Sequence, residues 1–313
     1  MDGFILVHKP QDFTSHDIVL FVRKILSVKK VGHFGTLDPM ATGLMLVAVG
    51  KATRFFPFFL NADKTYQGKM RLGFSTDTYD AYGKQTSEED NNYPNKQKLL
   101  ENMKQFEGTI DQVCPPFSAK KHMGTPLYEL ARQGQKMELK TKKVRIHYFR
   151  LLNYASPFVH FTVKCSSGTY VRSLVHDLGQ KLGCRAYLAQ LIRTNIGNFH
   201  QNESHSLEDI EMFFRKGMKD KFLIPLASIL PEYPSLFVED NTASMIARGR
   251  DILDISALKV VPGDTGRSQT GIIQENIYRI FDKRGKLIAL AKKNLSQESL
   301  HPFLVINPAD NNL

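Results

Sequence analysis

The chain has 313 residues, and 42% of them are hydrophobic, which is enough to bury a substantial core in one large or two medium domains. Its 42 Lys and Arg outnumber its 31 Asp and Glu, and the formal net charge of +11 favours a polyanionic partner, such as RNA, DNA or an anionic membrane. No apolar run approaches the roughly 18 residues that a membrane-spanning helix needs, and the first ten residues lack the pattern of a signal peptide. We therefore expect a cytoplasmic globular protein.

The chain opens with a strand followed by an amphipathic helix. Residues 3–8 (GFILVH) predict the strand, and the Lys-Pro pair after them ends it. Thr14 and Asp17 have the spacing of a capping box, and apolar residues recur at helical spacing over residues 18–25.

A glycine-rich turn that holds an acidic residue comes next. Gly35 and Gly43 permit positive φ or a close backbone approach, and Pro39 disfavours the helical region for Asp38. Residues 44–49 (LMLVAV) then predict a buried strand. Asp before Pro is a common turn former. A carboxylate fixed on a loop beside a core strand is also where catalytic groups occur.

Further elements follow at intervals along the chain. A strand begins at Lys64 and turns at Gly73, and residues 161–170 predict a strand ending in a glycine turn, with a helix over 171–182. Prolines punctuate residues 224–240 and indicate a domain boundary. Beyond it, NIYRIFD, KRGK and LIALAKK predict a strand, a turn and a second strand of one hairpin.

Two groups of residues have an ordinary interpretation when taken alone. The three cysteines are widely spaced and outside any CxxC pair, so they indicate neither a disulfide framework nor a zinc site. Residues 114–145 are rich in Lys and Arg, and such basic runs are most often solvated surface.

The string GHFGTLDPMATGLM at residues 32–45 closely resembles the catalytic motif of the TruB family of tRNA pseudouridine synthases. Other stretches resemble further motifs of that family, with Asp12 where glycine is usual and Ile192-Arg193 where paired arginines are usual. These stretches are HKPQDFTS, TDTYDAYG, CSSGTYVRSL and GCRAYLAQLIRTNIGNF. Gly249 and DKRGKLIAL resemble a PUA-like RNA-binding domain.

The resemblance implies an α/β (α+β) fold with a mixed, largely antiparallel central sheet. It places a catalytic domain at residues 1–230, with a basic RNA-binding insertion at about 114–145, and a small PUA-like β domain at 231–313. Guide-RNA-dependent archaeal and eukaryotic relatives lack such an insertion. We therefore expect a monomer that requires no guide RNA or protein partner.

The implied activity is isomerisation of uridine 55 in the TΨC loop of tRNA, acting on the T-arm with neither cofactor nor metal. Asp38 would be the nucleophile, Arg172 would pair with it through a planar two-pronged contact, and Tyr66 would stack on the extruded base and handle its proton. The implied substrate-binding residues are His33, which contacts the RNA, Leu191, which lines the pocket, and Lys64, Lys9 and Arg193.

Three other classes of protein have partial support. Residues 32–35 form a GXXG, but KH loops join two helices and carry no Asp-Pro. Residues 50–53 (GKAT) do not complete a P-loop. A non-enzymatic RNA chaperone of the same fold would not need Asp38, so the intact set of Asp38, Tyr66 and Arg172 favours an enzyme.

Overall fold

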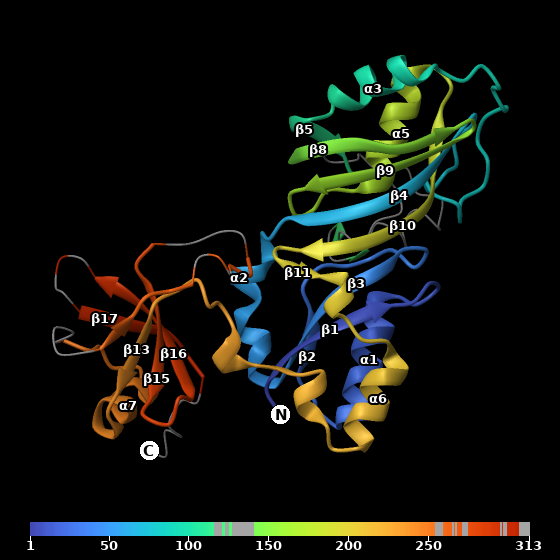
Figure 1. Ribbon diagram of the computed structural model, residues 1–313. Helices are drawn as coiled ribbons and strands as arrows, with labels where there is room; N and C mark the ends of the chain where they lie inside the picture. Colours follow the sequence, from blue (N-terminus) through green and yellow to red (C-terminus); the bar gives the residue numbers. More distant parts are fainter. Residues whose placement is uncertain are drawn as a thin grey trace.

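The computed structural model describes residues 1–115, 121–122, 125–126, 141–253, 259–264, 266, 268–270, 275–294, 296 and 299–306. Two sheets dominate these residues, and helices pack on both (Figure 1). The central sheet runs through the larger part of the molecule, and the second sheet is formed by the C-terminal residues. None of the helices in these ranges is both long and apolar enough to cross a bilayer.

The central sheet has the strand order β12-β1-β3-β10-β4-β9-β8-β5, with β2 on β3 and β11 on β10. Its strands are β1 (Gly3–Lys9), β2 (Val31–His33), β3 (Thr42–Val49), β4 (Lys64–Leu72), β5 (Gly108–Val113), β8 (Thr141–Ala155), β9 (Phe158–Cys165), β10 (Ala186–Ile196), β11 (Phe199–His200) and β12 (Ile224–Pro225). Among the described strands of this sheet, β3 and β10 form the one parallel pair. The predicted mixed, largely antiparallel sheet is confirmed.

The helices gather at the two ends of the central sheet. The α-helices are α1 (Ser15–Leu26), α2 (Phe56–Leu60), α3 (Lys96–Lys104), α5 (Val171–Leu182), α6 (Leu207–Arg215) and α7 (Asp240–Ala247). Helix α7 packs on the second sheet. Short 3₁₀ helices are η1 (Gly50–Phe55), η2 (Gln201–Glu203), η3 (Lys219–Lys221) and η4 (Leu226–Ser228). Helices α1 and α6 lie beside β1 and β3, whereas α3 and α5 lie at the far end with β8 and β9 (Figure 1).

Local sequence signals account for the positions of the first elements. Thr14 caps α1 by accepting from the backbone N–H of Asp17, and the Asp17 carboxylate accepts from the Thr14 N–H, so the capping box is confirmed. The strand predicted at residues 44–49 lies within β3, where every residue from Gly43 to Val49 is buried. The helix predicted over residues 171–182 is α5.

The second sheet has the order β14-β13-β15-β16-β17. Its strands are β13 (Ser235–Val238), β14 (Val260–Val261), β15 (Ile277–Asp282), β16 (Leu287–Asn294) and β17 (Ser299–Val305). The predicted hairpin is the antiparallel pair of β15 and β16, and the predicted C-terminal β domain is present. A short hairpin of β6 (Lys121–His122) and β7 (Thr125–Pro126) falls within the predicted insertion at 114–145, most of which lies outside the described residues.

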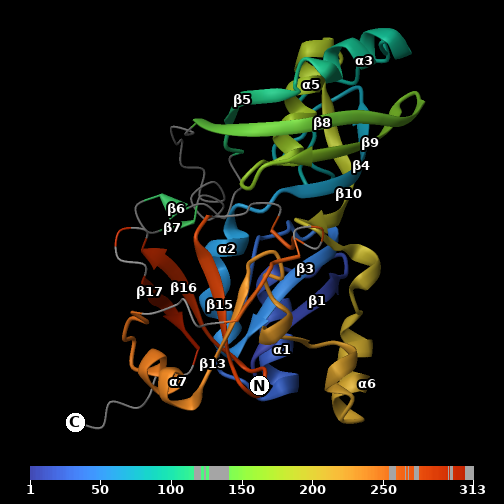
Figure 2. The same cartoon turned by 60° about the vertical axis from the view of Figure 1, so that its left-hand side comes forward.

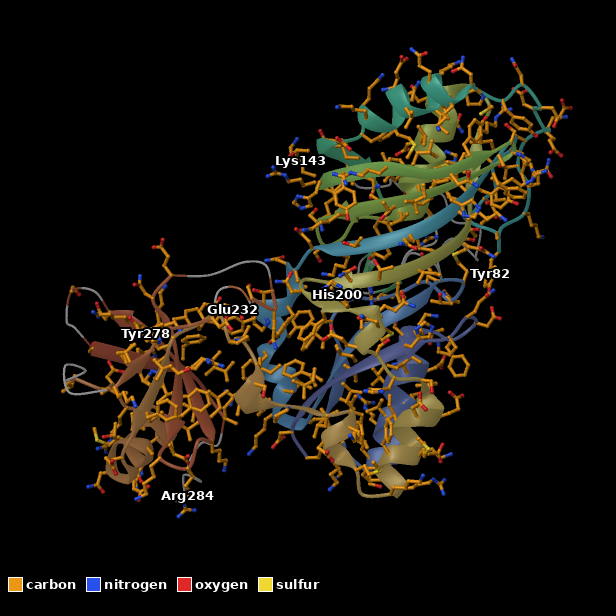
Figure 3. All side chains as sticks on the ribbon, in the orientation of Figure 1. Tyr82, Lys143, His200, Glu232, Tyr278 and Arg284 are labelled. Carbon is orange, nitrogen blue, oxygen red and sulfur yellow. The ribbon has the colours of Figure 1, made fainter. Side chains whose placement is uncertain are left out.

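The two sheets share one apolar core at α2, which lies between them in Figure 2. The ring of Phe58 lies 6.1 Å from the ring of Tyr233, in an edge-on arrangement, and 6.2 Å from the ring of Phe303. Glu232, labelled at this junction in Figure 3, is buried and accepts hydrogen bonds from the hydroxyls of Ser268 and Thr270. The junction is therefore a packed interface with a satisfied buried carboxylate.

Candidate functional site

A cavity of about 320 Å³ opens where strands β4 and β10 meet the turn after β2 and the N-terminus of α5. Four separate segments of the chain form its walls. Its lining residues are Gly35, Thr36, Leu37, Asp38, Lys64, Tyr66, Ser167, Gly168, Thr169, Tyr170, Val171, Leu191 and Arg193. Five of the eight residues predicted from the sequence therefore line it directly, and Arg172 lies immediately behind its wall.

The turn that carries Asp38 is held by hydrogen bonds on both sides. The buried Ser15 hydroxyl, on the first turn of α1, accepts from the Leu37 N–H at 2.9 Å and lies 3.2 Å from the Leu37 carbonyl oxygen, to which it donates. The Asp38 carbonyl oxygen accepts from the Ala41 N–H at 3.0 Å. Because the backbone groups of Leu37 and Asp38 are both hydrogen-bonded, Asp38 projects into the cavity from a rigid backbone.

Lys9 also stabilises this turn, through a hydrogen bond to the Pro39 carbonyl oxygen. Its side chain is fully buried, and its ammonium donates to the carbonyl oxygens of Pro10, Phe13 and Pro39 at 2.8, 2.7 and 3.2 Å. Burial lowers the pKa of Lys9 to about 8, although the nearby carboxylates oppose this shift. Lys9 was predicted to bind substrate, but it lies outside the cavity lining because its donors are already directed at backbone carbonyls.

Asp38 and Arg172 form a two-pronged ion pair. The Arg172 Nε lies 3.2 Å from Oδ2 of Asp38, and its Nη2 lies 3.4 Å from Oδ1. The Arg172 side chain is 4% exposed and that of Asp38 is 33% exposed. The guanidinium is thus buried behind the carboxylate, which keeps access to the cavity. A planar guanidinium in this position fixes both the charge and the orientation of the carboxylate.

A second carboxylate, that of Asp80, stabilises the loop that holds Arg172 in place. Arg172 Nη1 donates to the Thr78 carbonyl oxygen at 3.2 Å. The buried Asp80 accepts from the Thr78 hydroxyl at 2.6 Å and from the Tyr82 N–H at 3.0 Å. Burial raises the pKa of Asp80, which the nearby charge of Arg172 opposes. The TDTYD string was the signal for this loop, but its partner was not readable from sequence.

Tyr66 and Arg193 face each other across β4 and β10, where they are paired in register. Arg193 is buried and donates to the carbonyl oxygens of Leu44 at 2.7 Å and Gly35 at 3.0 Å, so it ties β10 to the turn that carries Asp38. It is also hydrogen-bonded to the Tyr66 hydroxyl. Burial raises the pKa of Tyr66, so the phenol enters the reaction protonated.

Gly43 makes this approach of Arg193 possible. Gly43 pairs with Arg193 between the parallel strands β3 and β10, at a φ of +99°. A Cβ at Gly43 would lie 2.5 Å from the Arg193 carbonyl oxygen, which no side chain could occupy without moving a strand. The glycine predicted from the motif is required by both conformation and space.

Lys64 and Leu191 complete the walls of the cavity. The Lys64 ammonium donates to the Ala62 carbonyl oxygen at 2.6 Å, and burial, followed by the charge of Arg193, lowers the pKa of Lys64 to about 8. Leu191 is buried and contributes apolar surface from β10. Lys64 therefore brings a cation, and Leu191 an apolar contact, to the same space as Asp38.

His33 lies at the end of β2, two residues before the cavity lining begins at Gly35. Its side chain is half-buried, and burial lowers its pKa, so it is neutral at physiological pH. Its position beside the cavity, outside the lining, separates it from the reacting groups. The structure therefore does not bring His33 to Asp38, as a general base would require.

Together these residues present an oriented carboxylate, a neutral phenol and two cations around one small cavity. A carboxylate with these surroundings can attack an electrophilic carbon of a nucleoside, and the ring of Tyr66 offers a face for a planar base. Arg172 can stabilise the negative charge that returns to Asp38 when such a bond breaks. The arrangement fits covalent chemistry on an extruded nucleoside.

Comparison with known proteins gives a consistent result. The family model described as "TruB family pseudouridylate synthase (N terminal domain)" matches residues 23–171, and that described as "tRNA pseudouridylate synthase B C-terminal domain" matches residues 172–231. A curated tRNA pseudouridine synthase B from Solibacter usitatus is 37% identical over 98% of this chain and 100% of its own length. One from Clostridium tetani is 40% identical over 94% of this chain and 96% of its own length.

Solved structures support the same fold. The chain in "Structure of H/ACA RNP bound to a substrate RNA containing 2'-deoxyuridine" is 25% identical, with a TM-score of 0.70 over 98% of this chain and 86% of that one. A chain in "Crystal Structure of a Cbf5-Nop10-Gar1 Complex" has a TM-score of 0.69, also at 25% identity, over 98% of this chain and 85% of that one.

The fold, the cavity and these matches define the chain as a pseudouridine synthase, an isomerase. Within that class it belongs to the TruB family.

Proposed function

We propose that this protein converts uridine 55 in the TΨC loop of tRNA to pseudouridine, with Asp38 as the nucleophile. The observation that carries the proposal is the two-pronged pair of Asp38 and Arg172 at a cavity that Tyr66 also lines. The names of the curated relatives support tRNA as the substrate.

The reaction breaks the bond between the ribose C1′ and N1 of uracil and joins C1′ to C5. In the process C5 loses a proton and N1 gains one. No atom is gained or lost. The uridine must first leave its stack, at a cost of a few kcal/mol that stacking on Tyr66 and phosphate contacts offset. Asp38 then forms the covalent intermediate. After C1′ is joined to C5, the hydroxyl of Tyr66, placed by Arg193, takes up the C5 proton as it passes its own proton to water, and N1 takes a proton from water, so the phenol is regenerated.

We further propose that the T-arm alone reaches the cavity, while residues 231–313 act as a PUA-like domain that binds more distant parts of the tRNA. Such remote contacts lower KM without changing kcat. The protein would act as a monomer, without a guide RNA or protein partner. The similar chain in "Crystal Structure of a Cbf5-Nop10-Gar1 Complex" belongs to a complex, so the purified chain has to be tested by itself.

The nucleophile can be tested by exchanging Asp38 for Asn. Asp63 offers a matched control, because its side chain is 32% exposed and also pairs with a basic residue, His147, at 2.9 Å. Single-turnover assays on a T-arm stem-loop should give no pseudouridine with Asp38→Asn and a rate close to wild type with Asp63→Asn. Pseudouridine formation by Asp38→Asn within one turnover would exclude Asp38 as the nucleophile.

A further inference from the structure

The strands that carry the cavity residues have a second, solvent-facing side. We call the outward side chains of β10, β4, β9 and β8 the outer face. Inward residues of β4 such as Tyr66 and Met70 are buried, whereas the intervening Gln67 and Lys69 are exposed or half-buried. Strand β9 alternates in the same way, with His160 and Lys164 outward. The outer face is therefore a continuous surface.

The outer face is strongly basic. None of the strands β4, β8, β9 and β10 contains an Asp or a Glu, although the chain as a whole has 31 of them. The register places Lys69 beside His160 on the neighbouring strand, and it places Lys164 beside Tyr148, whose ring Arg150 covers. The cationic side chains at outward positions are Lys69, Arg71, Lys143, Arg145, Arg150 and Lys164. Lys143 marks one end of this surface in Figure 3.

Most of this charge has no acidic partner nearby. Arg71 pairs with Glu89 at 2.6 Å, and Lys143 pairs with Asp111 at 3.1 Å at the sheet edge. Within the described part of the chain, Lys69, Arg150 and Lys164 form no ion pair. A stretch of uncompensated cations on a sheet attracts a polyanion.

Aromatic rings lie under two of these cations, Lys69 and Arg150. The Lys69 ammonium lies 4.0 Å from the centre of the Phe158 ring, and the Arg150 guanidinium carbon lies 4.6 Å from the centre of the Tyr148 ring. A guanidinium held flat on a ring offers its other face to a base, as does an exposed ring edge. Basic residues interleaved with aromatic ones on an open sheet favour unpaired nucleotides over a regular duplex.

This surface cannot be reached by the nucleotide in the cavity. Leu191 and Arg193 point inward on β10 and line the cavity, while Gln190 and Ile192, which alternate with them, point outward and are exposed. The sheet itself therefore separates the two sites. RNA on the outer face must be a different segment from the one that presents its uridine to Asp38.

We propose that the outer face is a second RNA-binding surface, which takes single-stranded RNA through phosphate contacts to Lys69, Arg150 and Lys164. Charge complementarity selects the partner, and the cation-covered rings select its unpaired form. This inference concerns binding alone and stands independently of which uridine is isomerised.

The test uses full-length protein and an oligoadenylate of about 12 nucleotides, which has no uridine for the cavity. The variant Lys69→Gln/Arg150→Gln/Lys164→Gln removes three charges from the outer face. The control Lys96→Gln/Lys98→Gln/Lys104→Gln removes three exposed charges from α3, on the opposite side of the sheet. Fluorescence anisotropy at several salt concentrations gives the dissociation constants.

We expect the outer-face variant to bind oligoadenylate at least about tenfold more weakly, with a slope of log K against log[salt] smaller by about 2, since each lost phosphate contact contributes about 0.7. The control should change little. Turnover on a T-arm stem-loop should be unaffected in both variants. Equal losses in the two variants would show a general charge effect, and unchanged oligoadenylate binding would show that this face serves another partner, such as a protein. Either result would overturn the proposal.

Discussion

The cavity around Asp38 and the interface between the two sheets are built from different kinds of side chain. Around the cavity, the buried Lys9, Arg172 and Arg193 each direct their donors at named oxygen atoms. At the interface, Phe58 and Tyr233 contact each other through ring surfaces. Hydrogen bonds to charged groups depend on geometry, whereas apolar contacts depend on buried area.

Substitutions in the two regions should therefore change different properties of the protein. A cavity residue can be replaced by one of similar size and charge and still lose its function, because the position of one atom has changed. An interface residue can lose several methylene groups without any effect on the reacting atoms, but the fold is then less stable. Kinetic and thermodynamic measurements should therefore separate the two regions.

Among the variants that keep Asp38, the largest expected effect is on turnover in Arg172→Lys. The lysine keeps the positive charge but replaces the planar fork by a single ammonium, so the contacts to both oxygens of Asp38 cannot be made together. Hydrogen bonds to charged groups are worth about 1.5–3 kcal/mol each, so kcat should fall by about 10³. Single-turnover rates on a stem-loop will measure it. A near-normal kcat would mean that the paired geometry is unimportant.

The interface should respond in stability. Phe58→Ala should lower the free energy of unfolding by about 3 kcal/mol, because it leaves a cavity between α2 and the second sheet. Phe56→Ala, on the same helix but 41% exposed, is the matched control and should cost far less. Urea titrations will give both values. If Phe58→Ala reduced kcat on the stem-loop and left the free energy of unfolding unchanged, the interface would not be a purely stabilising region.

Tyr66→Phe separates the stacking role of the Tyr66 ring from the proton-transfer role of its hydroxyl. The substitution keeps the ring for stacking and removes the hydroxyl that Arg193 holds, so RNA affinity should be preserved. General acid–base contributions are commonly 10²–10⁴ in rate, and we expect a fall in kcat of about 10². Measurement of kcat and KM for one stem-loop separates the two roles. A wild-type kcat would leave Tyr66 with stacking alone.

The smallest effect is a pH dependence of binding at Lys64. Because burial lowers its pKa to about 8, Lys64 is charged below that pH and becomes neutral above it. RNA affinity should therefore weaken, by about tenfold at most, as the pH rises from 7 to 9. Lys64→Gln should not show this weakening of RNA affinity. Lys64→Arg should not show it either, because arginine stays charged between pH 7 and 9. Identical pH profiles for wild type and Lys64→Gln would remove Lys64 from the binding site.

Local patterns in the sequence were sufficient for most elements of the fold. The capping box at Thr14, the glycine-bounded strand of β3 and the helix α5 depend on neighbours a few residues apart, and each lies where its pattern predicts. The glycines and the proline around Asp38 predicted a turn for the same reason, and that turn lines the cavity. Short-range spacing is what a single sequence records best.

The parts that sequence did not reveal depend on contacts between distant residues. Lys9 was expected to bind substrate, yet its ammonium is used by the carbonyl oxygen of Pro39, thirty positions away. Ser15 reaches Leu37, and Asp80 stabilises the loop that holds Arg172. A buried polar group requires a partner, but only the fold decides which one.

We propose that the cavity around Asp38 isomerises one uridine, in the T-loop of tRNA. The most direct test is to incubate the purified protein, without other factors, with an unmodified tRNA transcript and to map pseudouridine position by position. The account predicts one modified site, uridine 55, and no product when that uridine is replaced by cytidine. Pseudouridine at another position, or its absence from position 55, would contradict it.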